Sequence, residues 1–174
     1  QNAGIDTYLV DSKNADLYTY KDKVKKYISS VDDVKGLLEE IQEIIRLRKE
    51  EFENYRKQDS NIIPKVYYAR CEPVIVLIDD CDNFIAMVNT IKEISAKNVI
   101  EEASGVGITF IATVQATALK GYDEVTKLFK TAINAVILGN PNDQTVIPTY
   151  IKGPKSIIDF GYLYNRGQSK VIKI

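Results

Sequence analysis

Apolar residues recur at three- and four-residue steps across residues 31–55, which predicts a long amphipathic helix. Ser30 stands just before the first apolar position and Asp33 follows three residues later, so the pair matches a capping box at the start of the helix. The opposite face is charged, and we interpret it as a solvated surface rather than a binding site. The apolar positions are Val31, Val34, Leu37, Leu38, Ile41, Ile44, Ile45, Phe52 and Tyr55.

Short β-rich runs alternate with further helical patterns in the rest of the chain. The unbroken apolar run at 74–78 is typical of a strand that is buried on both faces in the middle of a parallel sheet. Other strands are predicted at 5–10, 108–114 and 135–138, helices at 84–94, 99–103 and 125–132, and a β-hairpin from 161–165 and 170–174 around Arg166 and Gly167.

This order of elements predicts an α/β fold with three layers and a mostly parallel sheet joined by right-handed crossovers. No internal repeat, low-complexity stretch or linker interrupts residues 1–174, so we expect a single domain. Its length is enough to bury about 70% of the surface of the unfolded chain. A hydrophobic fraction of 45% and a net charge of −1 exclude a disordered tail.

Composition removes several classes of chemistry. The chain has no histidine, which excludes the Ser-His-Asp triad, His-based zinc sites and the commonest general base. Cys71 and Cys81 are ten residues apart without a CxxC motif, so we expect neither a disulfide framework nor a metal knuckle, and a reducing cytosolic setting. The longest apolar run is too short for a membrane span, and from residues 1–174 we expect neither membrane insertion nor a targeting leader.

Polar side chains follow three of the predicted strands. In open α/β sheets, ligands bind at the carboxyl ends of the strands, so these residues are the candidates for a site. They are Asp11, Ser12 and Lys13 after the first strand, Asp79, Asp80 and Asp82 after the second, and Thr113 and Gln115 at the end of the third.

Four apolar residues followed by two acids form the Walker B pattern of P-loop nucleotide hydrolases. Asp79 would hold Mg²⁺ through its water shell, and Asp80 would stand where a general base orients the attacking water. Thr113 and Gln115 could then sense a γ-phosphate. The alternative is that the two acids are solvated carboxylates without a metal, that Thr113 and Gln115 make loop hydrogen bonds, and that Asp11 and Lys13 are turn formers.

The phosphate-binding loop GxxxxGK[ST] does not occur in these residues. Gly105 and Gly107 precede a strand, which is the wrong side for cradling phosphates at the N-terminus of a helix. We therefore expect ATP and Mg²⁺ to act as cofactors only if such a loop lies upstream. No cofactor is expected to bind this chain alone.

Five segments in order, from residue 5 to 174, resemble FtsK/SpoIIIE-type motor ATPases. IDTYLVDSKNADLYTY resembles the strand after the Walker A helix, and VIVLIDDCDNF the Walker B segment. GVGITFIATVQATAL resembles the sensor strand, FKTAINAVILGNPNDQTVI the segment that follows it, and GYLYNRGQSKVIKI the closing hairpin. The resemblance implies a RecA-like P-loop fold, of which this chain would be the Walker B half. It implies the Walker B role for Asp79 and Asp80 and the sensor role for Thr113 and Gln115. Asp11 would lie near the nucleotide.

Within that superfamily the chain is most similar to the last, degenerate ATPase domain of the EssC family, the coupling ATPases of type VII (Ess) secretion. This resemblance implies a cytoplasmic domain of a bacterial cell-membrane protein, stacked with other ATPase domains of the same protein and able to form a homo-hexamer. The implied substrates are small helical-hairpin secreted proteins. Asp80 replaces the usual Glu and is one methylene shorter, so we expect weak or regulatory nucleotide binding that drives or regulates export.

Two other functions stay open. The first is a non-enzymatic substrate-docking module of the same apparatus, suggested by the missing phosphate loop and by eleven tyrosines, Tyr67 and Tyr68 among them. The second is an FtsK-like DNA translocase, which would need a basic stripe along its channel. Because the chain is nearly neutral and its one basic cluster is small, we expect no nucleic acid partner. That cluster is Lys21, Lys23, Lys25 and Lys26.

Overall fold

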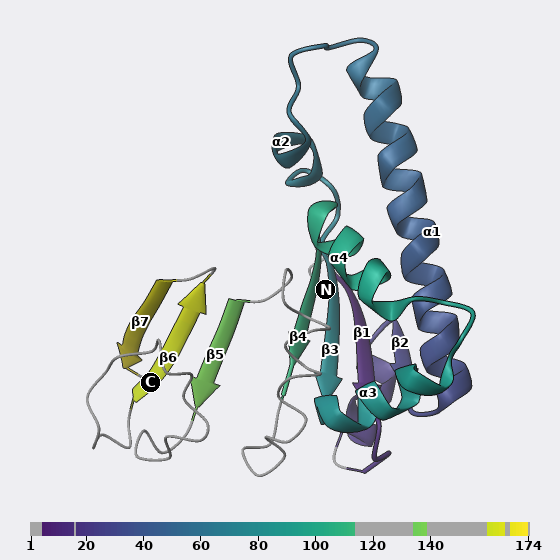
Figure 1. Ribbon diagram of the computed structural model, residues 1–174, viewed down its shortest axis with the longest axis vertical. Helices are drawn as coiled ribbons and strands as arrows, with labels where there is room; N and C mark the ends of the chain where they lie inside the picture. The colour runs from purple at the N-terminus through teal and green to yellow at the C-terminus, as the bar shows by residue number, and fades with distance from the viewer. Residues whose placement is uncertain (1–4, 16, 114–133, 139–159, 166–167, 174) are drawn as a thin grey trace.

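The computed structural model describes residues 5–15, 17–113, 134–138, 160–165 and 168–173. Its strands form two β-sheets (Figure 1). One sheet is parallel with the order β2-β1-β3-β4, and the other is antiparallel with the order β5-β6-β7. The elements are β1 (Asp6–Asp11), the 3₁₀ helix η1 (Tyr18–Lys23), β2 (Lys26–Ile28), α1 (Val31–Arg56), α2 (Pro64–Tyr68), β3 (Val74–Asp79), α3 (Cys81–Thr90), α4 (Ala96–Gly105), β4 (Ile108–Ala112), β5 (Asn134–Leu138), β6 (Phe160–Asn165) and β7 (Gln168–Lys173).

The parallel sheet places the candidate residues at one edge. β3 lies between β1 and β4, as its unbroken apolar sequence predicts. Asp11 is the register partner of Asp79, and Ile78 is that of Ala112. Because all four strands run the same way, the carboxyl ends of β1, β3 and β4 meet at the same level. The predicted parallel α/β arrangement is confirmed for these elements.

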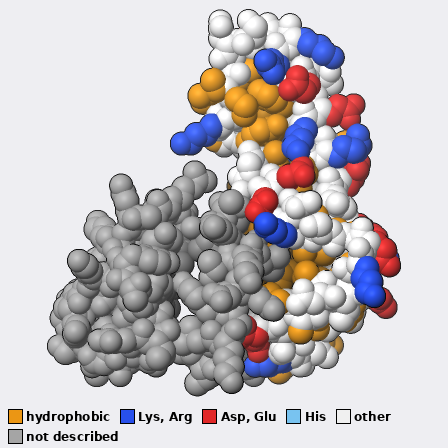
Figure 2. Space-filling model, in the orientation of Figure 1, with side chains coloured by type: hydrophobic (Ala, Val, Ile, Leu, Met, Phe, Trp, Pro, Cys, Tyr) orange, Lys and Arg blue, Asp and Glu red, His pale blue; other side chains and the backbone are white. Residues whose placement is uncertain are grey.

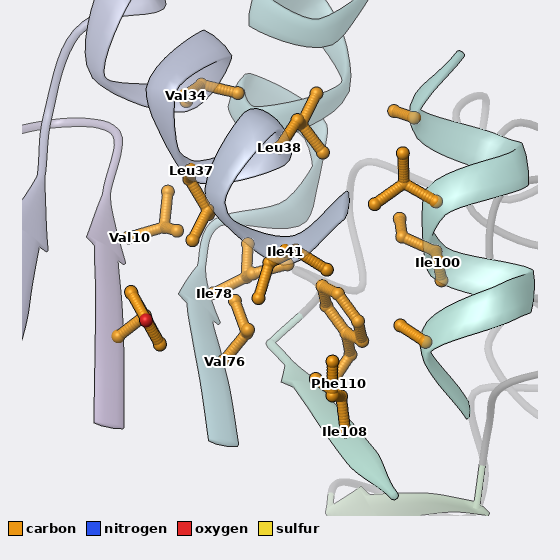
Figure 3. Close-up of a cluster of buried hydrophobic side chains, with 14 of the residues drawn as sticks. Val10, Val34, Leu37, Leu38, Ile41, Val76, Ile78, Ile100, Ile108 and Phe110 are labelled. Atoms are coloured by element: carbon orange, nitrogen blue, oxygen red, sulfur yellow. The ribbon is translucent and has the colours of Figure 1, made fainter. Parts of the chain in front are cut away.

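One face of the parallel sheet carries the core. Side chains from β3 and β4 point toward α1 and α4, and α3 joins the same buried cluster (Figure 3). On the other face of β3, Ile75 and Leu77 are half-buried, and the neighbouring Ile111 is 51% exposed. The predicted coverage of both faces of β3 is therefore complete on one face and partial on the other, because the described helices of this cluster share one face. The labelled core residues are Val10, Val34, Leu37, Leu38, Ile41, Val76, Ile78, Ile100, Ile108 and Phe110.

The capping box at the start of α1 is confirmed. The Ser30 hydroxyl accepts a hydrogen bond from the Asp33 N–H, and the Asp33 carboxylate accepts one from the Ser30 N–H. The hydrogen bond from the Ser30 hydroxyl lowers the pKa of Asp33 below its usual value. The charged face of α1 is a solvated surface as expected, with exposed ion pairs from Arg46 to Glu43 and Glu50.

Two elements were not anticipated from the sequence. β2 has three residues and begins at the second lysine of the pair Lys25 and Lys26, so it has no hydropathy signal. Its backbone pairing with β1 defines it. α2 is a single short helix that begins with Pro64, whose fixed φ suits the first helical position. Its aromatic residues pack on Phe52 of α1, with ring centroids 5.3 Å from Phe52 to Tyr67 and 5.4 Å to Tyr68.

Four other predictions have different outcomes. The strand at 135–138 exists, but it pairs antiparallel with β6 rather than extending the parallel sheet, because an apolar run does not specify its partner. The hairpin is confirmed as β6 and β7. α3 ends at Thr90, short of the predicted 94, and the helix expected at 125–132 lies outside the described residues.

Arg48 ties α1 to the amino ends of two strands. Its side chain is buried, and its guanidinium donates hydrogen bonds to the carbonyl oxygens of Val106, at 2.7 Å, and Glu72. These carbonyls precede β4 and β3. Next to Val106, Gly107 has φ +82°, and a Cβ on it would lie 3.0 Å from the Tyr68 carbonyl oxygen. The Arg48 guanidinium therefore supplies hydrogen-bond donors to the Val106 and Glu72 carbonyl oxygens, which lie just before the strands and outside their β-sheet pairing.

Replacing Arg48 by methionine should destabilise the fold by about 3 kcal/mol, because two carbonyls lose hydrogen bonds from a charged donor in a buried place. Urea unfolding followed by circular dichroism measures this. Arg46→Met, two residues away on the solvated face, is the matched control and should cost less than about 1 kcal/mol. Equal losses for the two variants would show that Arg48 has no special role.

Candidate functional site

The carboxyl edge of the parallel sheet brings together four of the five predicted site residues. Asp11 and Asp79 end adjacent strands in register, and Asp80 follows directly. The Thr113 N–H donates to the Ile78 carbonyl oxygen at 2.9 Å, so the β4 end lies against the β3 end. Gln115 lies outside the described residues.

Thr113 connects the two acids of the Walker B pattern. Its hydroxyl donates to Asp79 Oδ1 at 2.8 Å and accepts the Asp80 N–H at 3.0 Å. Its carbonyl oxygen accepts the Cys81 N–H at 2.9 Å. One residue thus fixes the orientation of the Asp79 carboxylate and the path of the backbone between β3 and α3. These contacts are the loop hydrogen bonds of the alternative interpretation, and the sensor role of Thr113 stays a prediction.

Asp80 occupies an unusual backbone conformation at the start of α3. Its φ of 57° and ψ of 76° lie in the left-handed region, which non-glycine residues rarely adopt. The residue is 8% exposed, and its Oδ2 forms an ion pair with the Lys13 ammonium and accepts a hydrogen bond from the Asn83 amide at 3.3 Å. Ser12 Oγ donates to the Asp79 carbonyl oxygen at 3.2 Å. The second acid is therefore held from several sides.

The sequence analysis did not single out Asn83, and it did not anticipate the contact between Lys13 and Asp80. Lys13 is in the turn after β1, where a lysine has no distinguishing pattern, and only the register of β1 against β3 brings the turn to Asp80. Asn83 is one turn into α3, three residues after Asp80. An amide three residues after an acid at a helix start is the one sequence signal that could have indicated this contact.

Asp11 is the most buried carboxylate of the site, at 1% exposure. Its Oδ2 accepts hydrogen bonds from the Tyr27 hydroxyl at 2.6 Å and from the Ala15 N–H at 3.1 Å. Burial, and then the bond to Asp11, raises the pKa of Tyr27 to about 12. The Oδ1 of Asp11 has no hydrogen-bond partner within the described part of the chain. Asp11 thus shapes its turn and also leaves a buried acceptor atom beside the Asp79 strand end.

The carboxylates at this edge fit an Mg²⁺ that is shared with a nucleotide better than an independent metal site. Among the described residues, no three acidic or thiol side chains stand close enough together to hold a metal. Mg²⁺ usually takes one or two protein carboxylates, several waters and substrate phosphates. Asp79, oriented by Thr113, would supply such a carboxylate, with Asp11 beside it. The phosphates need a cradle that these residues do not contain.

Cys81 is chemically silent although it begins a helix. A helix N-terminus usually lowers the pKa of a thiol. Here burial raises the pKa of Cys81 to about 12, and the charges of Asp82 and Asp80 add to the effect. Burial and the Asp80 charge also raise the pKa of Asp82 above its usual value. Cys81 is therefore a packing residue and not a nucleophile.

In the folded chain at pH 8, a disulfide reagent should label Cys71 and leave Cys81 unmodified, because about one Cys81 thiol in 10⁴ would be ionised. Labelling stoichiometry read by mass spectrometry measures this, and both thiols should react in urea. Cys71→Ser is the control and should leave no fast-reacting thiol. Rapid modification of Cys81 in that folded variant would contradict the burial of its side chain.

Thr113→Val should reduce the free energy of unfolding by about 1 kcal/mol, since it removes a bond to a carboxylate and leaves the Asp80 N–H without its acceptor. Thr109→Val, an exposed threonine on the same strand, is the control and should change it by less than about 0.5 kcal/mol. Urea unfolding of both variants provides the comparison. A Thr113→Val loss no larger than the control would show that the hydroxyl does not hold the turn.

Comparison with known proteins finds a curated relative. The chain is 25% identical over 171 residues to the ESX secretion system protein YukB of Bacillus subtilis (strain 168), covering 95% of this chain and 11% of YukB. No family model matches. The chain thus corresponds to about a tenth of that relative's length.

Solved structures agree on the fold. The cytoplasmic domain of EssC matches with a TM-score of 0.65 at 18% identity, covering 97% of this chain and 33% of that one. EssC (ATPases 2 and 3) from Geobacillus thermodenitrificans gives 0.58 at 17%, covering 97% and 30%. Thermomonospora curvata EccC (ATPases 2 and 3), in complex with a signal sequence peptide, gives 0.55 at 13%, covering 97% and 30%. The predicted RecA-like α/β fold and the resemblance to EssC-like domains of the FtsK/SpoIIIE type are confirmed.

The described helices were also compared with the length and apolar character of a membrane-spanning helix. Within the described ranges, no helix combines the length and the apolar character that crossing a bilayer requires.

Proposed function

We propose that this chain is the Walker B part of an ATPase-fold domain in a type VII secretion coupling protein, where weak nucleotide binding drives or regulates the export of small helical proteins. The observation that carries the proposal is the convergence of Asp11, Asp79 and Thr113 at the carboxyl edge of a parallel sheet, with Thr113 hydrogen-bonded to Asp79. The likeness to YukB over nearly the entire chain supports the secretion context.

In this proposal Asp79 binds the water shell of Mg²⁺, which would supply neutralisation of phosphate charge when a nucleotide is bound. Thr113 orients the Asp79 carboxylate, and a threonine at this position also suits contact with a γ-phosphate. Gln115 is proposed as the second sensor residue. The phosphates themselves would be held by a glycine-rich loop outside these residues.

Slow hydrolysis follows from the environment of Asp80. A general base must reach the attacking water directly or through one intermediate. An aspartate at this position has a shorter reach than a glutamate would, and Lys13 and Asn83 already occupy its Oδ2. The positioning of a catalytic group to about 1 Å can matter for rate by two orders of magnitude. We therefore infer a nucleotide site whose role is regulatory or structural more than hydrolytic.

The proposed setting is the cytoplasmic part of a bacterial membrane protein that contains further ATPase domains and assembles as a homo-hexamer. Support comes from the names of the similar structures, which describe a cytoplasmic domain and several numbered ATPases in one protein. The small helical-hairpin substrates are an inference of the same kind, from the secretion context of the relatives.

Calorimetry of Mg-ATP tests the nucleotide site on a chain that includes the residues preceding Gln1. We expect a dissociation constant at or below about 1 mM, weakened at least about tenfold by Asp79→Asn. Asp59→Asn in an exposed loop is the matched control and should bind as the unaltered chain does. The 174 residues alone should bind no nucleotide. Absence of binding to the longer chain at millimolar Mg-ATP would overturn this part of the proposal.

A substrate-docking module remains the second candidate because α2 presents apolar side chains to solvent. Ile63 before α2 is 56% exposed and Val66 within it 39%, and the upper part of the molecule in Figure 2 carries an apolar patch. Tyr68 is buried against Phe52, so of the tyrosine pair only Tyr67 is half-buried and near this surface. Failure to retain secreted substrates on the immobilised chain would eliminate docking.

A DNA motor is less well supported. Lys25 pairs with Asp6 and Glu40, and Lys26 pairs with Glu40, so part of the basic cluster is neutralised by the fold itself. A duplex-binding surface would need such charges free to displace counterions from phosphates.

A further inference from the structure

α3 begins differently from α1 and α4. Ser30 precedes α1 and Ser95 precedes α4, both in extended conformations, and each hydroxyl accepts a hydrogen bond from a backbone N–H of the first turn. This is the usual geometry of a residue that caps a helix. Asp80 precedes α3, and aspartate is among the best capping residues, yet within the described residues its side chain makes no capping hydrogen bond. Its φ of 57° is left-handed instead of extended.

The Asp80 carboxylate is engaged elsewhere. Its Oδ2 contacts the Lys13 ammonium and accepts a hydrogen bond from the side-chain amide of Asn83 at 3.3 Å. For residues with a Cβ the left-handed conformation is less favourable than the extended one, although aspartate tolerates it better than most. Asp80 thus has a second conformation open to it. In that conformation the backbone would be extended, and the carboxylate would accept a hydrogen bond from an N–H of the first turn of α3.

Three residues hold Asp80 in the left-handed conformation. The Thr113 hydroxyl accepts the Asp80 N–H at 3.0 Å, and the Thr113 carbonyl oxygen accepts the Cys81 N–H at 2.9 Å. Ser12 Oγ donates to the Asp80 carbonyl oxygen at 3.5 Å, and Lys13 pairs with the carboxylate. The Thr113 hydroxyl is also the group for which the proposed function gives a contact with a γ-phosphate. A ligand that took this hydroxyl would remove the hydrogen bond of the Asp80 N–H.

We propose that Asp80 is a conformational switch between β3 and α3, with Thr113 as the positioning residue that sets it. In the conformation that the structure shows, the Thr113 hydroxyl holds Asp80 left-handed and α3 is uncapped. When another group takes this hydroxyl, Asp80 becomes extended, leaves Lys13 and caps α3. The start of α3 then reports a contact made at the end of β4. This inference deepens the proposed function and rests on it only for the identity of the ligand, a γ-phosphate.

Nuclear magnetic resonance tests the switch without any ligand, because the Cα and Cβ chemical shifts of residue 80 differ between left-handed and extended backbone. Thr113→Val removes the hydroxyl at nearly constant shape. It should raise the ratio of extended to left-handed Asp80 about tenfold, the equivalent of one hydrogen bond, and move these shifts toward extended values. Thr113→Ser keeps a hydroxyl and should retain the shifts of the unaltered chain. Unchanged shifts in Thr113→Val, or an equal movement in Thr113→Ser, would overturn the switch.

Amide hydrogen exchange separates the switch from a purely structural contact. If Asp80 caps α3 in Thr113→Val, exchange at the Asn83 N–H should become several-fold slower, because this donor of the first turn gains an acceptor. Loss of a structural hydrogen bond alone would leave this exchange equal or faster. Exchange at Ile41, in the middle of α1, is the internal reference and should not change. Equal or faster exchange at Asn83 therefore overturns the switch.

Two variants of Asp80 cover the case in which Thr113→Val does not fold. Serine and asparagine cap helices about equally well, but asparagine tolerates the left-handed conformation and serine does not. Exchange at the Asn83 N–H should therefore be at least about threefold slower in Asp80→Ser than in Asp80→Asn. Ser95→Asn compares the same two residue types at the ordinary cap of α4, and it should change exchange there less than about twofold. Equal exchange in the two Asp80 variants would contradict the switch.

The switch and the proposed function fail in distinguishable ways. If the longer chain binds no Mg-ATP while Thr113→Val moves residue 80 to the extended conformation, the nucleotide site is wrong and the switch stands. If nucleotide binds and residue 80 stays left-handed in Thr113→Val, the switch alone is wrong.

Discussion

The parallel register of β1, β3 and β4 is the constraint on which the rest of the structure depends. It places Asp11 opposite Asp79 and brings Thr113 alongside, so that one hydroxyl can bond to both acids of the Walker B pattern. A shift of one residue in any of these strands would turn the side chains to the other face of the sheet. The core packed under α1 and α4 fixes the register and therefore the site.

The two adjacent acids have different environments, and this difference determines what each can do. Asp79 ends a strand and has its carboxylate oriented by a neutral hydroxyl, which leaves its charge uncompensated by that contact. Asp80 begins a helix in a left-handed conformation and has a lysine beside it. The sequence pattern treats them as a pair, whereas in three dimensions a hydroxyl orients one carboxylate and an ion pair holds the other.

Periodicity and capping predicted the elements that bury the most surface. The nine apolar positions and the Ser30–Asp33 box defined α1 closely, and the unbroken run of β3 identified the central strand. The pattern could not show which strands would pair, so β5 was assigned to the wrong sheet. Short elements such as β2 form because a neighbour offers backbone partners, and their own sequence has no signal of that.

The candidate site divides in the same way into residues that the sequence revealed and residues that it did not. Asp11, Asp79 and Thr113 were found because they terminate strands, which is a position that sequence reveals. Lys13 was interpreted as a turn former, because its contact with Asp80 depends on register, side-chain reach and burial together.

The hydrogen bonds of Arg48 divide α1 into a part that lies on the sheet and a part that extends past it. Up to Arg48 the helix lies on the sheet, and beyond it about eight residues, roughly 12 Å of helix, continue past the sheet with α2 at their side (Figure 1). A force applied to this part of α1 would act on the sheet through the hydrogen bonds of the Arg48 guanidinium. It would reach the sheet at the amino ends of β3 and β4, about 20 Å along β3 from the carboxylates. A partner bound to this end of α1 would therefore be separated from the carboxylates by the length of β3.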